Sequence, residues 1–452
     1  MSGRELSTGI TRRQLLGRGS ALLALAGAGA IPAFAKGSTS SFRSPDLADA
    51  AALAAFTRFD IRLAATDGHA LFPGRGSPSV VDGSGDPVGD PVYIFGFVRV
   101  PLNVTPAALD TLKGIVQFPS PIIGVDQEAD VYISMTNIGL VVRPDLDDSH
   151  TIHWHGFPNA TAIFDGVPEV SIAVPVGRTF PYYYNPHRAG SFMYHCHFED
   201  VEHVQMGMQG SVFVRPSQNG TSLGGYTMFA YNDGDGSTGY EREFTLLLDE
   251  IWTEPHDNLE SIQETVWPNY DANYWTINGR SYPDTLVSNN DSSLPAQPLS
   301  ALMQVREGDQ VLLRFANLGY EQQSMQLPGI GMRVVGEDAA LLRGPGGADL
   351  SYLTNTIYIG PGEARDVIIT APAFSDLLPF ETDANGRYNV YWLKNRDLQR
   401  LTNGGLAGLG GQVTQLWVYE GTSLTAQAHP NQTYPESAAS PPYMDPWVFE
   451  GS

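Results

Sequence analysis

The sequence predicts an all-β protein made of two similar domains, each a Greek-key sandwich or barrel of short antiparallel strands. Apolar and polar residues alternate in runs such as PVYIFGFVRVPL (91–102) and DVYISMTNIGLVV (130–142), and Gly, Pro, Asn and Asp separate these runs. Stretches with helical periodicity are few and short. A chain of 452 residues exceeds one ordinary hydrophobic core, so more than one domain is expected.

An internal repeat defines the two domains. GDQVLLRFANLG (308–319) resembles ADVYISMTNIG (129–139), and GRYNVYWL (386–393) stands in the second half where GSFMYHCH (190–197) stands in the first. We therefore expect an export signal over residues 1–35 and an N-terminal extension over residues 36–90. The first domain is expected over residues 91–220, the second domain over residues 243–422 and a tail over residues 423–452.

The first 35 residues resemble a twin-arginine export signal. Arg12 and Arg13 precede a weakly apolar run rich in Ala, Leu and Gly, and Ala33-Phe34-Ala35 supplies small residues for cleavage before Lys36. We expect the protein to be exported to the periplasm or the extracellular space. Such signals carry folded proteins that often hold their cofactors already, which favours a metal or redox group.

Charge and cysteine content narrow the function further. The formal net charge of −23 should repel nucleic acids and anionic lipid surfaces. Cys196 is the only cysteine, so an internal disulfide is excluded. In an exported protein such a thiol is a hazard unless it forms an intermolecular link or is protected by a bound ligand.

Six of the ten histidines lie in two short segments, HTIHWHGF from residue 150 and YHCHFEDVEH from residue 194. Side chains alternate between the two faces of a strand, so His153 and His155 share one face while His150 points to the other. Likewise His195 and His197 share a face from which Cys196 points away. Paired strands would place two metal sites on opposite sides of one sheet.

The residues on the first side match a blue-copper electron-transfer site. His150, Cys196, His203 and Met208 supply two imidazoles, a thiolate and a weak thioether, and Met is a poor ligand for zinc. Met206 is an alternative axial ligand. On the other side, the imidazoles of His153, His155, His195 and His197 suit one or more further coppers. The isolated residues His69, His187, His256 and His429 are expected at structural or surface positions.

These motifs resemble the multicopper oxidases, specifically their two-domain, laccase-like branch, with copper nitrite reductases as relatives of the same cupredoxin fold. HTIHWHG and HCHFEDVEHVQMGM carry the resemblance, together with FDGVPEV (164–170) and INGRSYPDT (277–285). It implies two cupredoxin-like domains, type 1 copper on His150, Cys196, His203 and Met208, and half of a type 2/type 3 cluster on the other four histidines. It further implies Asp165 as a proton relay, O2 as acceptor and a homotrimer.

The second domain departs from the family pattern. Aligning the repeats places Gln323, Gln326 and Pro328 where the first domain has His150, His153 and His155, and it places Tyr391, Trp392 and Leu393 under residues 195–197. A cluster like the family's needs eight histidines, four from each of two facing domains. The second domain is therefore expected to lack every copper ligand.

Three functions follow from this partial ligand set. The first is a laccase-like oxidase, in which type 1 copper takes single electrons from a phenol or metal-ion donor and passes them through Cys196 to the four-histidine cluster, where O2 is reduced. The second is a type 1 copper electron-transfer protein, or a protein similar to nitrite reductase, with an incomplete second site. The third is a copper-binding protein without turnover.

Overall fold

The alternating runs of the sequence form strands in a computed structural model that describes residues 58–81, 84, 87–88, 90–421, 424–433 and 447–448. The predicted export signal lies outside these residues. The described strands form four large sheets, two in each domain, and a small pair made of β2 (Ser77–Val81) and β3 (Pro87–Val88). This arrangement confirms the all-β fold class.

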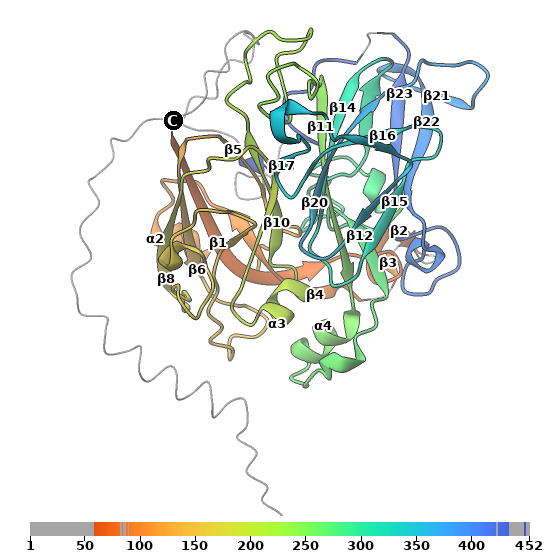
Figure 1. Cartoon of the computed structure of the whole chain (residues 1–452). Coiled ribbons are helices and arrows are strands. Elements are labelled where there is room, and N and C mark those ends of the chain that lie inside the picture. The colour runs from red at the N-terminus through yellow and green to blue at the C-terminus, as the bar shows by residue number, and fades with distance from the viewer. Residues whose placement is uncertain are drawn as a thin grey trace, which may run out of the picture. The chain divides into compact units, whose positions relative to one another are not determined.

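The first domain packs two sheets against each other (Figure 1). One sheet has the order β4 (Val92–Arg99), β1 (Arg58–Ala70), β6 (Asp130–Asn137), β8 (Arg178–Tyr184). The other has the order β24 (Trp447–Val448), β5 (Ile122–Asp126), β10 (Gln209–Arg215), β9 (Gly190–His195), β7 (His153–His155). Buried side chains of both sheets form one core that contains Cys196 and Met208, so apolar packing fixes the strands that carry the histidines.

The second domain repeats this architecture. Its first sheet has the order β12 (Tyr274–Ile277), β11 (Arg242–Ile251), β14 (Gln310–Asn317), β20 (Ala364–Thr370), β16 (Met332–Glu337), β17 (Ala340–Leu341), with β18 (Tyr352–Thr354) on β16. Its second sheet has the order β13 (Met303–Arg306), β23 (Val413–Tyr419), β22 (Gly386–Asn395), β15 (Gln323–Gln326), β19 (Thr356–Ile359), with β21 (Phe380–Asp383) on β22. The strands β1, β6, β9 and β10 thus have counterparts in β11, β14, β22 and β23.

Helices are short and lie in the connections. In the described part of the chain, the α-helices are α2 (Pro106–Asp110), α3 (Asp200–Gln205) and α4 (Thr253–Glu260), and the 3₁₀ turns are η1 (Ala162–Phe164), η2 (Trp267–Asn269), η3 (Asp284–Leu286), η4 (Pro345–Gly347) and η5 (Leu398–Leu401). Among the described residues, no helix is long and apolar enough to cross a membrane. Only α3 carries a candidate copper ligand, His203.

Two features differ from the sequence prediction. Residues 58–70, which we assigned to an N-terminal extension, form β1 between β4 and β6, so the sheets of the first domain begin at residue 58. In addition, β1 pairs with β6 in parallel and β5 pairs with β10 in parallel, although alternating patterns suggested antiparallel strands. Alternation reports which face is buried, and it does not report the direction of the neighbouring strand.

A buried carboxylate fixes the loop that leads to the first histidine segment. Asp67, three residues before the end of β1, accepts hydrogen bonds from the backbone N–H groups of Val141 (2.7 Å) and Val142 (2.8 Å). In the second domain Glu250, at the end of β11, accepts from the backbone N–H groups of residues 320 and 321. The repeat therefore preserves a polar anchor at the same place in both domains.

A buried asparagine provides a second anchor in each domain. Asn137 donates from Nδ2 to the carbonyl of Val174 (3.0 Å), and Asn317 donates in the same way to the carbonyl of Ile359 (3.3 Å). Both asparagines end a central strand, β6 and β14. The two pairs give a structural alignment of the domains that is independent of the histidine motifs.

The second domain is held against the strand that carries the copper motif. Asp366 on β20 accepts a hydrogen bond from Ser191 Oγ on β9 (2.5 Å) and another from the Tyr231 hydroxyl. The Arg314 guanidinium lies 3.4 Å from the same carboxylate, and both charged groups are buried. Because buried charges are stable only when paired, this cluster constrains how β9 meets the second domain.

We predict that Asp67→Ala lowers the free energy of unfolding by about 3 kcal/mol, because it leaves two backbone N–H groups and the Tyr93 hydroxyl without an acceptor. Tyr93→Phe, which removes one of these donors and keeps the carboxylate, should cost about 1 kcal/mol. Urea denaturation measures both values. Equal costs for the two variants would contradict the anchoring role of Asp67.

Candidate metal centre

The strand register brings the two histidine segments together. His153 on β7 pairs with His195 on β9, and β9 pairs on its other edge with β10, where Gln209 faces His195. The amide of Cys196 then donates to the carbonyl of Met208 at 3.0 Å. Strands β7 and β9 and the residues next to β9 and β10 thus hold six of the predicted ligands on adjacent backbone segments: His153, His155, His195, Cys196, His197 and Met208. Helix α3, which follows β9, adds His203.

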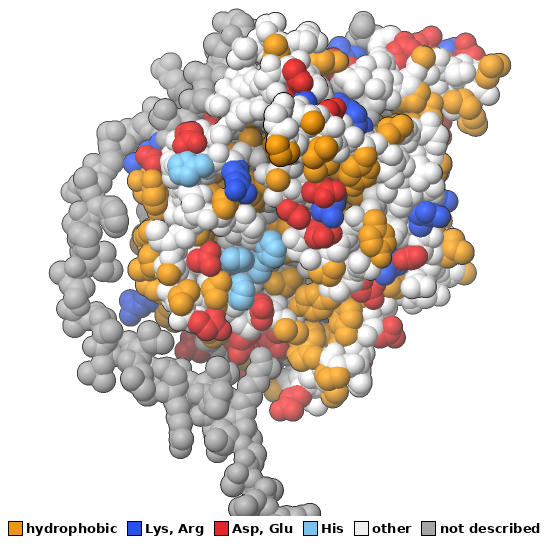
Figure 2. All heavy atoms as spheres, in the orientation of Figure 1, with side chains coloured by type: hydrophobic (Ala, Val, Ile, Leu, Met, Phe, Trp, Pro, Cys, Tyr) orange, Lys and Arg blue, Asp and Glu red, His pale blue; other side chains and the backbone are white. Residues whose placement is uncertain are grey.

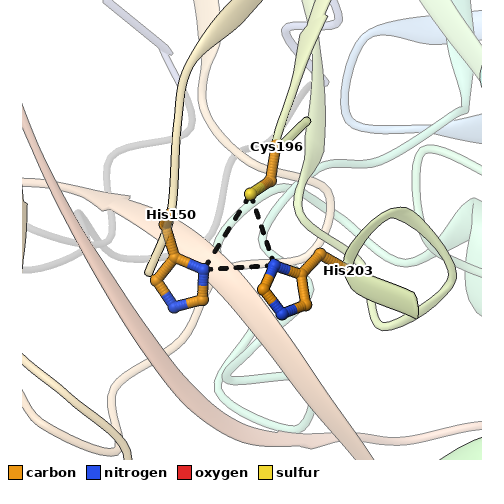
Figure 3. Close-up of side chains that lie close together, drawn as sticks. All are labelled: His150, Cys196 and His203. Carbon is orange, nitrogen blue, oxygen red and sulfur yellow. Dashed lines mark hydrogen bonds between the residues drawn. The ribbon is translucent and has the colours of Figure 1, made fainter. Parts of the chain in front are cut away.

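On one side of the sheet, His150, Cys196 and His203 converge (Figure 3). Cys196 Sγ lies 3.4 Å from His203 Nδ1 and 3.9 Å from His150 Nδ1, and the two Nδ1 atoms are 3.4 Å apart. All three residues are fully buried. Two imidazole nitrogens and one sulfur therefore face a common point that water does not reach.

The donor set fits a copper ion. The Nε2 atoms of His150 and His203 are buried without a hydrogen-bond partner, so the protein does not use these rings as ordinary core hydrogen bonders. Cys196 Sγ accepts a weak hydrogen bond from the Thr151 amide at 3.4 Å, as suits a thiolate. Two imidazoles and one thiolate are the strong ligands of blue-copper sites, so His150, Cys196 and His203 would hold copper here.

Met208, the residue directly before β10, completes the predicted ligand set. It is fully buried, and its amide donates to the carbonyl of His203 at 3.0 Å. Gly207 before it has φ of +110°, and an added Cβ would lie 2.9 Å from the Phe118 ring and 3.0 Å from the Phe95 carbonyl. Only glycine allows the chain to turn here, which places Met208 beside the Cys196 backbone. Met206 is buried as well.

Burial and local charge shift the pKa values of His150 and His203 in opposite directions. Burial, together with the charge of His203, holds the pKa of His150 well below its usual value. Burial also acts to lower the pKa of His203, but the charges of a Cys196 thiolate and of Asp148 outweigh it and raise this pKa to about 10. When no metal is bound, the His203 ring is therefore protonated near neutral pH.

On the other side of the sheet, hydrogen bonds to backbone carbonyls fix the tautomers of two imidazoles. His153 Nδ1 donates to the carbonyl of Asp165 at 2.6 Å, and His195 Nδ1 donates to the carbonyl of Cys196 at 2.9 Å. The turn at Gly362, in the second domain, lies against the ring of His155, since an added Cβ there would be 3.0 Å from His155 Nε2. The rings of His153 and His195 thus each have one nitrogen occupied and a lone pair on the other, which is the arrangement of a metal-ligating histidine.

The free nitrogens of these rings lie close together. His155 Nδ1 is 3.3 Å from His195 Nε2, and ligand nitrogens of His153, His155 and His195 all lie within 4.8 Å of one another. Burial lowers the pKa of His153 and His155 and lowers that of His195 to about 3. All three imidazoles are therefore neutral near pH 7 and available to bind a metal.

This histidine group borders solvent. His195 is 8% exposed, whereas His153, His155 and His197 are partly exposed. Figure 2 shows histidine side chains at the surface near the middle of the view, with acidic side chains around them. A cavity of about 400 Å³ lies beside His155 and His195, and its wall includes Tyr320 and Gly362 of the second domain. Small molecules can therefore reach this side of the sheet.

Family comparisons agree with this geometry. Two family models described as multicopper oxidase match residues 111–219 and 242–376, one in each domain. The chain belongs to the multicopper oxidase family. Both matched segments contain strands of the repeated sheets, so the family assignment covers the second domain as well as the copper-motif domain.

Solved structures and curated relatives agree with the family. The blue copper oxidase of Nitrosomonas europaea is 22% identical with a TM-score of 0.55, and the match covers 80% of this chain and 85% of that one. Multicopper oxidase mgLAC is also 22% identical, with a TM-score of 0.54 and coverage of 80% and 86%. Laccase-5 of Arabidopsis thaliana is 27% identical over 266 residues, 58% of this multicopper oxidase and 39% of the laccase. The chain thus spans less than half the length of that curated relative.

The structural alignment identifies the second-domain residue that stands in place of His150. His150 bridges to Val174, the residue held by Asn137, and Gln323 pairs with Ile359, the residue held by Asn317. Gln323 therefore corresponds to His150. By the same offset Gln326 and Pro328 stand in place of His153 and His155, as the sequence predicted.

The predicted equivalents of residues 195–197 were wrong by three positions. His153 pairs with His195, whereas its counterpart Gln326 pairs with Lys394. Lys394, Asn395 and Arg396 thus replace the His-Cys-His motif, and Tyr391, Trp392 and Leu393 do not. The sequence alignment failed because it matched the glycines at the strand starts, although β22 begins farther from its ligand end than β9.

In this multicopper oxidase a hydrogen-bonded network fills the second-domain counterpart of the type 1 site. Asn395 donates from Nδ2 to Gln323 Oε1 (3.0 Å) and to Gln412 Oε1 (2.7 Å), and Gln412 corresponds to Met208. Gln323 in turn donates to Glu250 at 2.8 Å and accepts from Arg400 at 2.8 Å. Amide groups satisfy each other there, so the site has no thiolate or imidazole for copper.

The sequence predicted residues that the structure brings together in the first domain, but it did not indicate some of the groups that orient them. The Asp165 side chain lies 3.7 Å from His153 Nδ1, and its backbone carbonyl holds that ring; a proton-relay role stays a prediction. His197 lies beside His153, with ring centroids 5.1 Å apart, but falls outside the converging group of three. The contact of Gly362 with His155 had no signal in the sequence, because it joins two domains.

We predict that Met208→Leu retains the blue colour of the copper-loaded protein and raises its reduction potential, because the oxidised ion loses a weak donor. Met206→Leu is the matched control, since it removes a buried thioether from the same loop. Redox titration followed by visible absorption measures both variants. A larger change in Met206→Leu would identify Met206 as the axial ligand instead.

We predict that the metal-free protein loses stability as the pH falls from about 6.5 towards 3. The pKa of His195 is about 3 when folded and about 6.5 when unfolded, so the unfolded chain binds more protons in this interval. Buried His256, with a pKa of about 4, acts in the same direction. Denaturation at pH 7 and pH 4.5 should show the loss, which His195→Gln should reduce. Equal stability at both values would contradict the buried, neutral state of these rings.

Proposed function

We propose that this protein is a copper-dependent oxidoreductase that removes single electrons from a phenolic or metal-ion donor and uses O2 as the acceptor. The observation that supports it most is the convergence of His150, Cys196 and His203 at distances of 3.4–3.9 Å in a fully buried site. Bound copper supplies one-electron oxidation and reduction there. The protein's part is to hold the ion in a fixed, dry ligand cage.

Cys196 connects this cage to the second histidine group. Its side chain belongs to the first site, while its backbone continues directly into His195 and His197, which face the opposite side of the sheet. The carbonyl of Cys196 also accepts the hydrogen bond that orients the His195 ring. One residue therefore gives a short covalent connection between the two sites, which a protein with a single function at the first site would not require.

The surroundings of the second group support a small acceptor such as O2. The cavity beside His155 and His195 is about 400 Å³ and is partly lined by apolar Val201, Val204 and Leu318. We propose that the partly exposed carboxylate of Asp165, 3.7 Å from His153 Nδ1, delivers protons to this side of the sheet. Export through the twin-arginine signal and assembly as a homotrimer belong to the same proposal.

The second candidate is a type 1 copper electron-transfer protein with an incomplete second site. The second-domain counterparts of His153, His155, His195 and His197 favour it, because they are Gln326, Pro328, Lys394 and Arg396 and the family's cluster takes histidine ligands from two domains. Oxygen consumption distinguishes the two functions. Copper-loaded protein that stays blue but consumes no O2 with phenolic or ferrous donors would support electron transfer and contradict the oxidase.

We predict that Cys196→Ser abolishes the blue colour and reduces donor oxidation at least 100-fold, because the hydroxyl does not replace the thiolate as a copper ligand. His187→Ala is the control, since His187 is an exposed residue paired with Glu128 at 2.7 Å. It should change neither property. Visible spectra and oxygen-electrode rates test the pair, and a blue Cys196→Ser protein would refute the ligand assignment.

A further inference from the structure

The cluster that the family implies does not fit the ligands of this chain. Three copper ions between facing domains need imidazoles from both domains, and the second-domain positions that correspond to the four-histidine group are Gln326, Pro328, Lys394 and Arg396. Lysine and arginine are cationic near neutral pH and do not ligate copper. A second copy of this chain would therefore supply no imidazole from this face.

Other histidines of the described chain have different partners. His69 Nε2 lies 3.1 Å from Glu260, and His187 Nδ1 lies 2.7 Å from Glu128. His256 is fully buried and donates from Nδ1 to the Tyr93 carbonyl at 2.5 Å. None of these three joins a group that could hold a metal ion. The histidine group of the first domain must therefore bind its metal largely with its own residues.

Within that group, His155 and His195 present nitrogens to each other. The Cys196 carbonyl occupies Nδ1 of His195, which leaves Nε2 as the free nitrogen of that ring. His155 Nδ1 lies 3.3 Å from this Nε2 atom. A metal ion that replaced the proton shared by the two nitrogens would therefore have two imidazole donors already in place.

His153 is the third member of this set and His197 is not. The Asp165 carbonyl occupies His153 Nδ1, which leaves Nε2 as the free nitrogen, and the three residues form one group within 4.8 Å. His197 is more exposed, its Nδ1 faces the Asp200 carboxylate at 3.9 Å, and it lies outside the group. Three imidazoles can satisfy one copper ion, whereas one imidazole alone cannot retain another.

We propose that the second copper centre is mononuclear and is held within the first domain by His153 Nε2, His155 Nδ1 and His195 Nε2. The second domain acts on it only through positioning, since the Gly362 backbone orients His155 and an added Cβ at Gly362 would lie 3.0 Å from His155 Nε2. A three-imidazole centre keeps an open position for a small ligand from the adjoining cavity. The proposal rests on copper as the metal of the proposed function.

The test compares total copper with copper visible by electron paramagnetic resonance (EPR) in the full, copper-loaded chain. The proposal predicts two copper ions per chain, both visible, because coupled pairs of Cu(II) ions, which give no signal, are absent. His155→Ala should reduce the content to one ion and keep the blue signal. The matched control His197→Ala, from the same histidine group, should retain two.

Other results would overturn the proposal. Three or four ions per chain with a silent fraction would show a coupled cluster, and loss of copper in His197→Ala would show that the fourth imidazole is a ligand. One ion per chain with no effect of His155→Ala would show that the second centre does not form. A wild-type protein that has no blue colour, but whose EPR signal from copper is lost in His155→Ala, would support the mononuclear centre. It would contradict the proposed function instead.

Discussion

The hydrogen bond from the Cys196 amide to the Met208 carbonyl, at 3.0 Å, is the contact on which both metal sites depend. It extends the β9–β10 ladder by one residue, so that Cys196 is held in strand-like register where the strand ends. Alternation then sends its sulfur into the core and the neighbouring imidazoles to the opposite face. A shift of one residue would exchange the two faces and destroy both sites.

The second domain shows what the fold requires once copper binding is lost. The anchoring carboxylate and asparagine persist as Glu250 and Asn317, and the strand order repeats. The ligand positions, however, hold amides that satisfy one another around Asn395. A buried polar pocket must be filled by a metal or by mutual hydrogen bonds, because unpaired polar groups are costly there. This domain has retained the scaffold and replaced the metal with a hydrogen-bond network.

The second domain contributes to the metal sites by positioning residues of the first domain. Asp366 holds β9 through Ser191, and the turn at Gly362 contacts the ring of His155. Both contacts reach the histidine-bearing strands from outside their own sheet. The second domain therefore supports the orientation of ligands that lie in the first, as outer-shell groups do in metal sites generally.

Local pattern in the sequence was sufficient to predict the all-β fold, the repeat and the faces of the two histidine segments, because strand alternation and motif spacing are local properties. Residues 58–70 were placed in an extension, since the Gly- and Pro-rich stretch that follows them masks a strand whose partners, β4 and β6, lie farther along the chain. The sequence alignment of the second domain with residues 195–197 was wrong by three positions, because β22 is longer than β9. Contacts such as that of Gly362 with His155 depend on domain packing, which no local pattern encodes.

We infer that the first domain alone holds copper, in two separate sites on opposite faces of one sheet. Anomalous diffraction at the copper edge from crystals of the loaded protein would locate the ions. We expect one peak among His150, Cys196 and His203 and one peak between His155 and His195 in each chain. A group of three peaks at the second position, or a peak beside Asn395 in the second domain, would contradict it.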